Sequence, residues 1–125
     1  MSLKTICIVE DTEDLLENLT AFLSLEGFRV MACSSATEAL EKLSVEMPDM
    51  IITDLWMPGM DGYAFIDRVK ATPGWGTIPI MVFTAAPLKP DERVMLESKT
   101  HGIVVKPVAM ESFLETIKAF FNKLN

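Results

Sequence analysis

The sequence has no apolar run approaching the ~18 residues of a membrane-spanning helix, and no signal-peptide pattern opens it, so we expect no membrane segment. Basic residues are scarce: 11 lysines and arginines stand against 18 acidic residues, and the net charge is −7. This balance argues against nucleic-acid binding by the chain itself. The single histidine, His101, has no partner at metal-ligand spacing, which favours a loop residue over a ligand.

Cysteine is also rare, with two in 125 residues. Cys7 and Cys33 each lie in an apolar, strand-like run, which favours buried free thiols. Free thiols fit a reducing compartment, and we expect the chain in the cytoplasm. A single disulfide between the two cysteines is the alternative that the sequence leaves open.

The composition is that of a folded domain, because half of the residues are hydrophobic and 23% are charged. The length suits one domain over residues 1–125 with a substantial core. No internal repeat, linker or low-complexity segment divides the chain. Short β-favouring runs predict five strands, at 5–9, 28–33, 50–53, 78–84 and 103–105.

Helix signals lie between these runs. Gly27 predicts the end of the first helix, and Ser35 followed by Glu38 forms a capping box for the second. Asp61 suits an N-cap, and Pro90 suits the first position of a further helix. The last helix has one apolar face, made of Met110, Phe113, Leu114, Ile117, Phe120, Phe121 and Leu124. Alternating strands and helices predict an α/β fold, a doubly wound parallel sheet with helices on both faces.

Polar residues stand at the carboxyl ends of four expected strands. In strand order they are Glu10 with Asp11, Asp54, Thr84 and Lys106. Singly, each has an ordinary explanation, as a helix start, a turn residue, a strand end or an exposed lysine. Ligand sites of doubly wound sheets lie at this edge, however, and four strand ends carrying polar residues favour one joint site.

The residue types indicate phosphoryl chemistry. Three carboxylates in one pocket repel each other, and Mg²⁺, which takes carboxylate and phosphate oxygens, relieves that repulsion. Lys106 would add a positive charge, and Thr84 a hydroxyl donor, around a phosphoryl group attached to Asp54. The sequence therefore predicts Asp54 as a phosphoryl acceptor.

Four motifs make the chain resemble the receiver domain of two-component response regulators. They are Ile8-Val9-Glu10-Asp11, the stretch from Asp54 to Gly62, Thr84-Ala85 and Lys106-Pro107. The resemblance covers essentially the whole chain. It implies a flavodoxin-like, five-stranded sheet of order 2-1-3-4-5 and a signalling domain rather than an enzyme.

The resemblance also assigns roles to residues. Asp54 resembles the phosphorylated aspartate, and Asp11, Asp54 and the backbone carbonyl of Trp56 resemble the Mg²⁺ ligands, with Glu10 acting through water. Thr84 and Lys106 resemble the switch hydroxyl and the phosphate-pairing lysine.

The same resemblance implies a cis Lys106–Pro107 bond. The implied partner is a sensor histidine kinase or a histidine phosphotransfer protein. The surface of the fourth helix, fifth strand and fifth helix is the implied switch face, and a homodimer could form through it.

Two positions depart from the family pattern. Ile103 stands where the switch usually has an aromatic residue, and Lys99-Thr100 replaces a frequent Gly-Ala pair.

An alternative function is a receiver-like interaction module that works without phosphorylation. Such modules usually lack one of the site residues, whereas this sequence has all of them. A hydrolase resembling the haloacid dehalogenases would need a second aspartate where Trp56 stands. A flavin carrier would need a hydroxyl-rich loop after the first strand.

Overall fold

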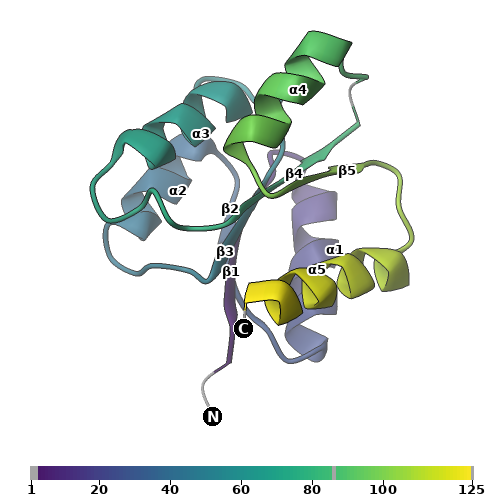
Figure 1. The fold of residues 1–125 in the computed structure, drawn as a ribbon. Coiled ribbons are helices and arrows are strands. Elements are labelled where there is room, and N and C mark those ends of the chain that lie inside the picture. The colour runs from purple at the N-terminus through teal and green to yellow at the C-terminus, as the bar shows by residue number, and fades with distance from the viewer. Residues whose placement is uncertain (1–2, 86, 125) are drawn as a thin grey trace.

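The computed structural model describes residues 3–85 and 87–124, without the side chain of Leu124. Five parallel strands form one sheet in the order β2-β1-β3-β4-β5, which confirms the expected fold class and strand order (Figure 1). The strands are β1 (Thr5–Val9), β2 (Arg29–Cys33), β3 (Met50–Thr53), β4 (Ile80–Thr84) and β5 (Gly102–Val105).

Helices cover both faces of the sheet (Figure 1). They are α1 (Glu13–Leu25), α2 (Ala36–Leu43), α3 (Gly62–Ala71), α4 (Pro90–Lys99) and α5 (Met110–Leu124). No described helix is both long and apolar enough to cross a bilayer.

Two apolar cores result from the alternation of side chains along the buried strands. Ile6 and Ile8 of β1 face one core, with Leu19 of α1 and Phe113 of α5. Cys7 and Val9 face the other core, which contains residues of α2, α3 and α4, including Ala39, Phe65 and Leu96. Because β1 is apolar on both faces, its boundaries could be read directly from the sequence.

The structure corrects two expected strand starts. Phe28 belongs to the turn after α1, because its N–H donates to the carbonyl of Leu23, so β2 begins at Arg29. Ile78 likewise donates to Trp75 in a turn, and β4 begins only after Pro79. In both cases a local turn hydrogen bond takes the N–H group that strand pairing would need.

The helix caps largely follow the sequence signals. Gly27 has φ +95°, and the side chain of Asp61 accepts the N–H of Ala64. Ser35 accepts the N–H of Glu38, as a capping box requires. The carboxylate of Glu38, however, binds the N–H of Ser34 rather than that of Ser35, which corrects the second half of the predicted box.

The two cysteines are buried and free, which confirms the favoured prediction. Their sulfurs lie 3.9 Å apart on the neighbouring strands β1 and β2. Cys7 pairs in register with Met31, so Cys33 is offset by two residues. Strand spacing and rise place the two Cα atoms roughly 8 Å apart. A disulfide would need a closer approach, so these backbones would have to move for one to form.

Candidate functional site

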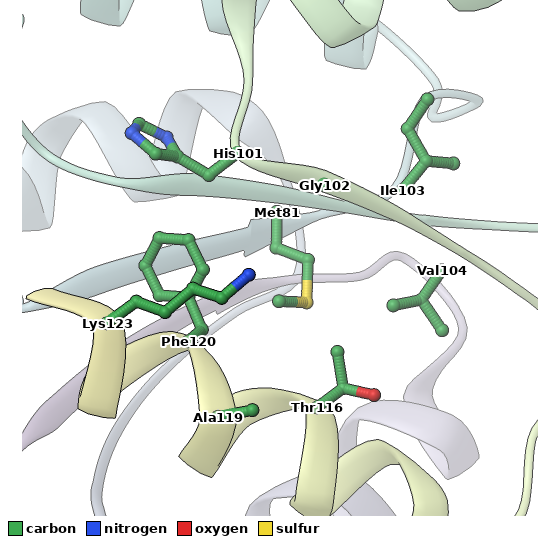
Figure 2. Close-up of a pocket in the computed structure, with 9 residues that line it drawn as sticks. All are labelled: Met81, His101, Gly102, Ile103, Val104, Thr116, Ala119, Phe120 and Lys123. Carbon is green, nitrogen blue, oxygen red and sulfur yellow. The ribbon is translucent and has the colours of Figure 1, made fainter.

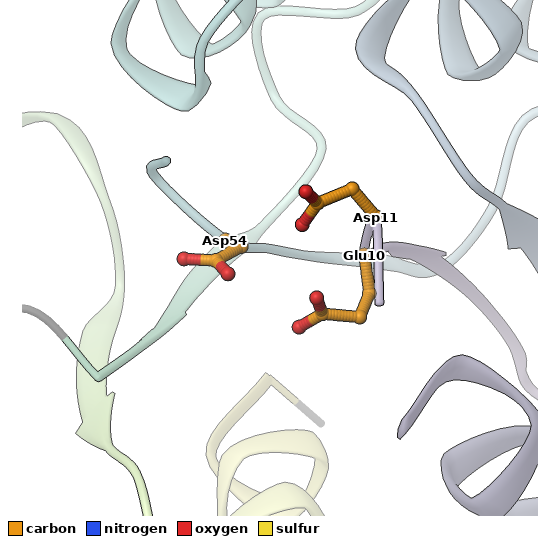
Figure 3. A group of neighbouring side chains, drawn as sticks. All are labelled: Glu10, Asp11 and Asp54. Atoms are coloured by element: carbon orange, nitrogen blue, oxygen red, sulfur yellow. The ribbon is translucent and has the colours of Figure 1, made fainter. Parts of the chain in front are cut away.

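Three carboxylates gather at the carboxyl edge of the sheet, where β1 and β3 lie side by side. Glu10 and Asp11 follow β1 and Asp54 follows β3, and one ligand oxygen from each residue lies within 4.8 Å of the others (Figure 3). Glu10 and Asp54 are only 2% and 8% exposed. Because such oxygens are the ligands that hard divalent cations prefer, the cluster fits Mg²⁺.

Lys106 connects two of these carboxylates. Its ammonium nitrogen lies 2.6 Å from Oε1 of Glu10 and 3.0 Å from Oδ2 of Asp54. It also lies 5.1 Å from the centre of the Phe83 ring. Burial disfavours the ammonium form, but the two carboxylates outweigh this effect and raise the pKa of Lys106 above its ordinary value. The lysine therefore remains a cation at neutral pH.

The carboxylate of Asp54 is oriented through both of its oxygens. Oδ1 accepts the N–H groups of Leu55, at 2.6 Å, and Trp56, at 3.4 Å. Oδ2 faces Lys106. The backbone N–H of Asp54 donates to the carbonyl of Val9, so strand pairing fixes the acid beside the end of β1. The loop and the lysine together hold the side chain in one orientation.

Gly62 allows the loop after Asp54 to fold back on itself. Its N–H donates to the carbonyl of Leu55 at 2.8 Å. A Cβ atom at this position would lie 2.2 Å from the carbonyl oxygen of Asp54 and 2.6 Å from the Cα of Leu55. The close approach explains why glycine occupies the first turn of α3, a role that sequence reasoning assigned only as part of a motif.

Thr84 and Trp56 complete the predicted set. Thr84 is fully buried at the end of β4, and its carbonyl accepts the N–H of Lys106 at 2.9 Å. The Lys106–Pro107 bond is cis, as the resemblance implied. The side chain of Trp56 is 53% exposed beside the acidic cluster. The structure thus brings Glu10, Asp11, Asp54 and Lys106 into one cluster and ties the end of β4 to it through the backbone.

Sequence reasoning missed Tyr63. Its ring meets the ring of Trp56 edge to face, with the centroids 5.9 Å apart, and its hydroxyl donates to Glu92 of α4 at 2.8 Å. Burial and then the contact with Glu92 raise the pKa of Tyr63 to about 12. No local pattern indicates this contact, because the two hydrogen-bonded residues are 29 positions apart.

A separate hollow lies between β5 and α5, away from the carboxylates (Figure 2). Its volume is about 310 Å³, and Met81, Val104 and Phe120 form its apolar lining, with His101 and Lys123 also at its border. The imidazole of His101 meets the ring of Phe120 edge to face, and its Nδ1 accepts the N–H of Ile80 at 3.4 Å. His101 lies in the loop just before β5, as the sequence predicted.

The fold and the acidic edge define a doubly wound, flavodoxin-like α/β domain. The family profile of the response regulator receiver domain matches residues 6–118. The chain therefore belongs to the receiver domain family of two-component response regulators.

Individual relatives agree with this assignment. The chain is 30% identical to the transcriptional regulatory protein KdpE of Mycobacterium tuberculosis over 91% of the chain and 49% of that protein. It is 27% identical to the polar-differentiation response regulator DivK of Brucella ovis over 94% of the chain and 95% of that protein. The chain thus spans about half the length of one relative and nearly the whole of the other.

A solved structure shows the same fold. The receiver domain of a signal transduction histidine kinase from Syntrophus aciditrophicus superposes with a TM-score of 0.86 at 31% identity. The alignment covers 98% of this chain and 92% of that one.

Proposed function

We propose that the chain accepts a phosphoryl group on Asp54 in a Mg²⁺-dependent reaction and that the acyl phosphate switches a protein-interaction surface. The observation that carries this proposal is the setting of Oδ2 of Asp54, which lies 3.0 Å from Lys106 and within a cluster of three carboxylates. Membership of the receiver family supports it.

Asp11, Asp54 and the backbone carbonyl of Trp56 would hold Mg²⁺, with Glu10 acting through water. When bound, the ion neutralises charge on the phosphoryl oxygens. Side chains of the protein supply the remaining charge and hydrogen-bond donor. Lys106 carries a fixed positive charge to the edge where the phosphoryl oxygens would lie, and Thr84 offers a hydroxyl donor from the end of β4.

In the proposed reaction, an oxygen of Asp54 attacks phosphorus while the bond from phosphorus to the donor's histidine nitrogen breaks. The nitrogen keeps the electron pair of that bond, and the product is an acyl phosphate on Asp54. Water later cleaves the acyl phosphate, which releases inorganic phosphate and restores the carboxylate. The chain would therefore act as a phosphoacceptor, with slow self-dephosphorylation at most.

The proposed donor is a sensor histidine kinase or a histidine phosphotransfer protein, and the proposed location is the cytoplasm. The surface of α4, β5 and α5 is the proposed switch face, and a homodimer through it is part of the proposal. Exposed apolar side chains on two of these elements support a contact surface there, since Val94 and Met95 of α4 and Val105 of β5 are 69%, 39% and 49% exposed.

The test is intact-mass analysis after incubation with Mg²⁺ and a small acyl-phosphate donor. We expect the added mass of one phosphoryl group in the wild type and none in Asp54→Asn. Asp67→Asn is the matched control, because it removes an exposed carboxylate outside the cluster and should leave labelling unchanged. An unmodified wild type, under conditions that label a known receiver domain, would contradict the proposal.

A further inference from the structure

An aromatic and polar connection runs from the loop after Asp54 to the start of α4. The backbone N–H of Trp56 donates to Oδ1 of Asp54, and the indole ring of Trp56 contacts the ring of Tyr63. The hydroxyl of Tyr63 in turn donates to Glu92 at 2.8 Å. One continuous series of contacts therefore joins the acidic cluster to α4, a helix that contributes no carboxylate to that cluster.

Glu92 uses its two carboxylate oxygens for two different elements. Oε2 accepts the hydroxyl of Tyr63 on α3, and Oε1 accepts the backbone N–H of Lys89 immediately before α4. This second bond closes the first turn of α4. Any force on Tyr63 therefore acts on the group that stabilises the start of α4.

The position of Ile103 makes this connection more important. Its side chain is partly buried against the core beneath α4 and has no polar atom. It therefore cannot form or exchange a hydrogen bond when the neighbouring strand end changes. Tyr63, in contrast, has both a ring that contacts Trp56 in the loop and a hydroxyl that reaches α4.

We propose that Tyr63 is a positioning residue that couples the state of the Asp54 loop to the first turn of α4 through Glu92. This coupling rests on the proposed function and is the route by which phosphorylation of Asp54 would be transmitted to α4. When the two carboxylate oxygens of Asp54 change their partners, Trp56 is displaced. The ring of Trp56 then moves the ring of Tyr63. The hydroxyl of Tyr63 then shifts against Glu92, and the first turn of α4 changes its stability.

Coupling of this kind is reciprocal, so removing the hydroxyl must also change the affinity of the acidic cluster for a cation. Tyr63→Phe keeps the ring that contacts Trp56 and removes only the bond to Glu92. A coupling free energy at the lower end of the usual range corresponds to about a fivefold change in Mg²⁺ affinity.

The experiment compares three variants with the wild type. Tyr63→Phe removes the donor, Glu92→Ala removes the acceptor, and Lys99→Ala is the matched control. Lys99 forms a 2.8 Å ion pair with Asp67, so it also joins α4 to α3, but at the other end of α4. Each protein is measured with and without Mg²⁺ and a small acyl-phosphate donor.

The first readout is hydrogen–deuterium exchange at the start of α4, where the N–H of Arg93 bonds to the carbonyl of Lys89. We expect phosphorylation to change the exchange rate there at least about fivefold in the wild type and in Lys99→Ala. We expect this change to be lost in Tyr63→Phe and Glu92→Ala. A purely structural role would alter exchange equally in both states and leave the difference intact.

The second readout is the affinity for Mg²⁺ without any phosphodonor. It is measured from the fluorescence of Trp56 in proteins whose Trp75 is replaced by Phe. The coupling is contradicted if phosphorylated Tyr63→Phe keeps the exchange difference of the wild type, or if its Mg²⁺ affinity equals that of Lys99→Ala. Failure of the proposed function is a different result, because Asp54 then stays unlabelled in every protein, the wild type included.

Discussion

Lys106 and Glu10, 96 residues apart in the chain, form an ion pair with 2.6 Å between nitrogen and oxygen. The carboxylate is 2% exposed, so it pairs with this lysine and is largely shielded from solvent. The same ammonium group reaches Asp54, which makes it the cation that balances two acids from two strands. A cation so placed both stabilises the fold and lies beside the proposed phosphoacceptor.

Replacing Lys106 with Met keeps the apolar stem and removes the charge. We expect the free energy of unfolding to fall by about 2 kcal/mol or more without Mg²⁺, because buried acids are left unpaired. Added Mg²⁺ should restore part of this loss. Urea unfolding with and without the ion measures both effects. Lys99→Met, which breaks an exposed pair with Asp67, should cost less than about 1 kcal/mol, and an equal loss in both variants would contradict the prediction.

Gly62→Ala tests the close approach at the start of α3. The added Cβ would meet the backbone of Asp54 at 2.2 Å, so we expect a loss of about 2 kcal/mol in stability and weaker phosphoryl labelling. Gly102→Ala is the control, since an added Cβ there meets no described atom within 4 Å. Thermal unfolding distinguishes them. Similar stability for the two variants would show that the loop can relax.

Trp56 should report on the acidic cluster. In a protein with Trp75 replaced by Phe, we expect Mg²⁺ to change the fluorescence of the remaining tryptophan, because the backbone N–H of Trp56 donates to Asp54. Asp11→Asn in the same background should weaken the response, because it removes one of the proposed carboxylate ligands. A fluorescence titration measures the change. A signal that stays constant up to saturating Mg²⁺ would argue against this placement of Trp56.

The titration of Tyr63 tests the contact with Glu92 directly, because this is the only tyrosine in the chain. Its pKa is raised from 10.0 to about 12 by burial and by the hydrogen bond to Glu92. The folded state thus holds the proton more tightly than the unfolded state. The resulting stabilisation is intact below about pH 10 and is lost as the pH rises toward 12.

Ultraviolet absorbance of the phenolate follows this titration. We expect a midpoint near 12 in the native protein and near 10 in urea, with a lower native midpoint in Glu92→Gln. Equal midpoints in native and denatured protein would mean that Tyr63 does not form the hydrogen bond in solution.

Much of the fold could be predicted because local chemistry determines it. The strands β1 and β3 are apolar on both faces and buried along their whole length, so their ends are visible in the sequence. The caps at Ser35 and Asp61 involve residues only three positions apart. The starts of β2 and β4 were predicted less well, because turn hydrogen bonds at Phe28 and Ile78 compete with strand pairing.

The site could be predicted as a set of residues but not as a set of contacts. Parallel strands necessarily bring Glu10, Asp54 and Lys106 to one edge of the sheet. That Lys106 bridges two acids depends on side-chain rotamers, and the bond from Tyr63 to Glu92 depends on how α3 packs against α4. Packing between helices is set by the whole core, so no short motif encodes it.

The order of the strands also has a consequence for biosynthesis. Asp54 and Lys106 are 52 residues apart, an interval that a ribosome translates in roughly 3 to 10 seconds. During that interval the nascent chain has its acids but not the cation that balances them, and β5, the edge strand before Lys106, is still missing. A chain cut before β5 would have the same defect. The acidic cluster is therefore completed only when the last strand joins the sheet.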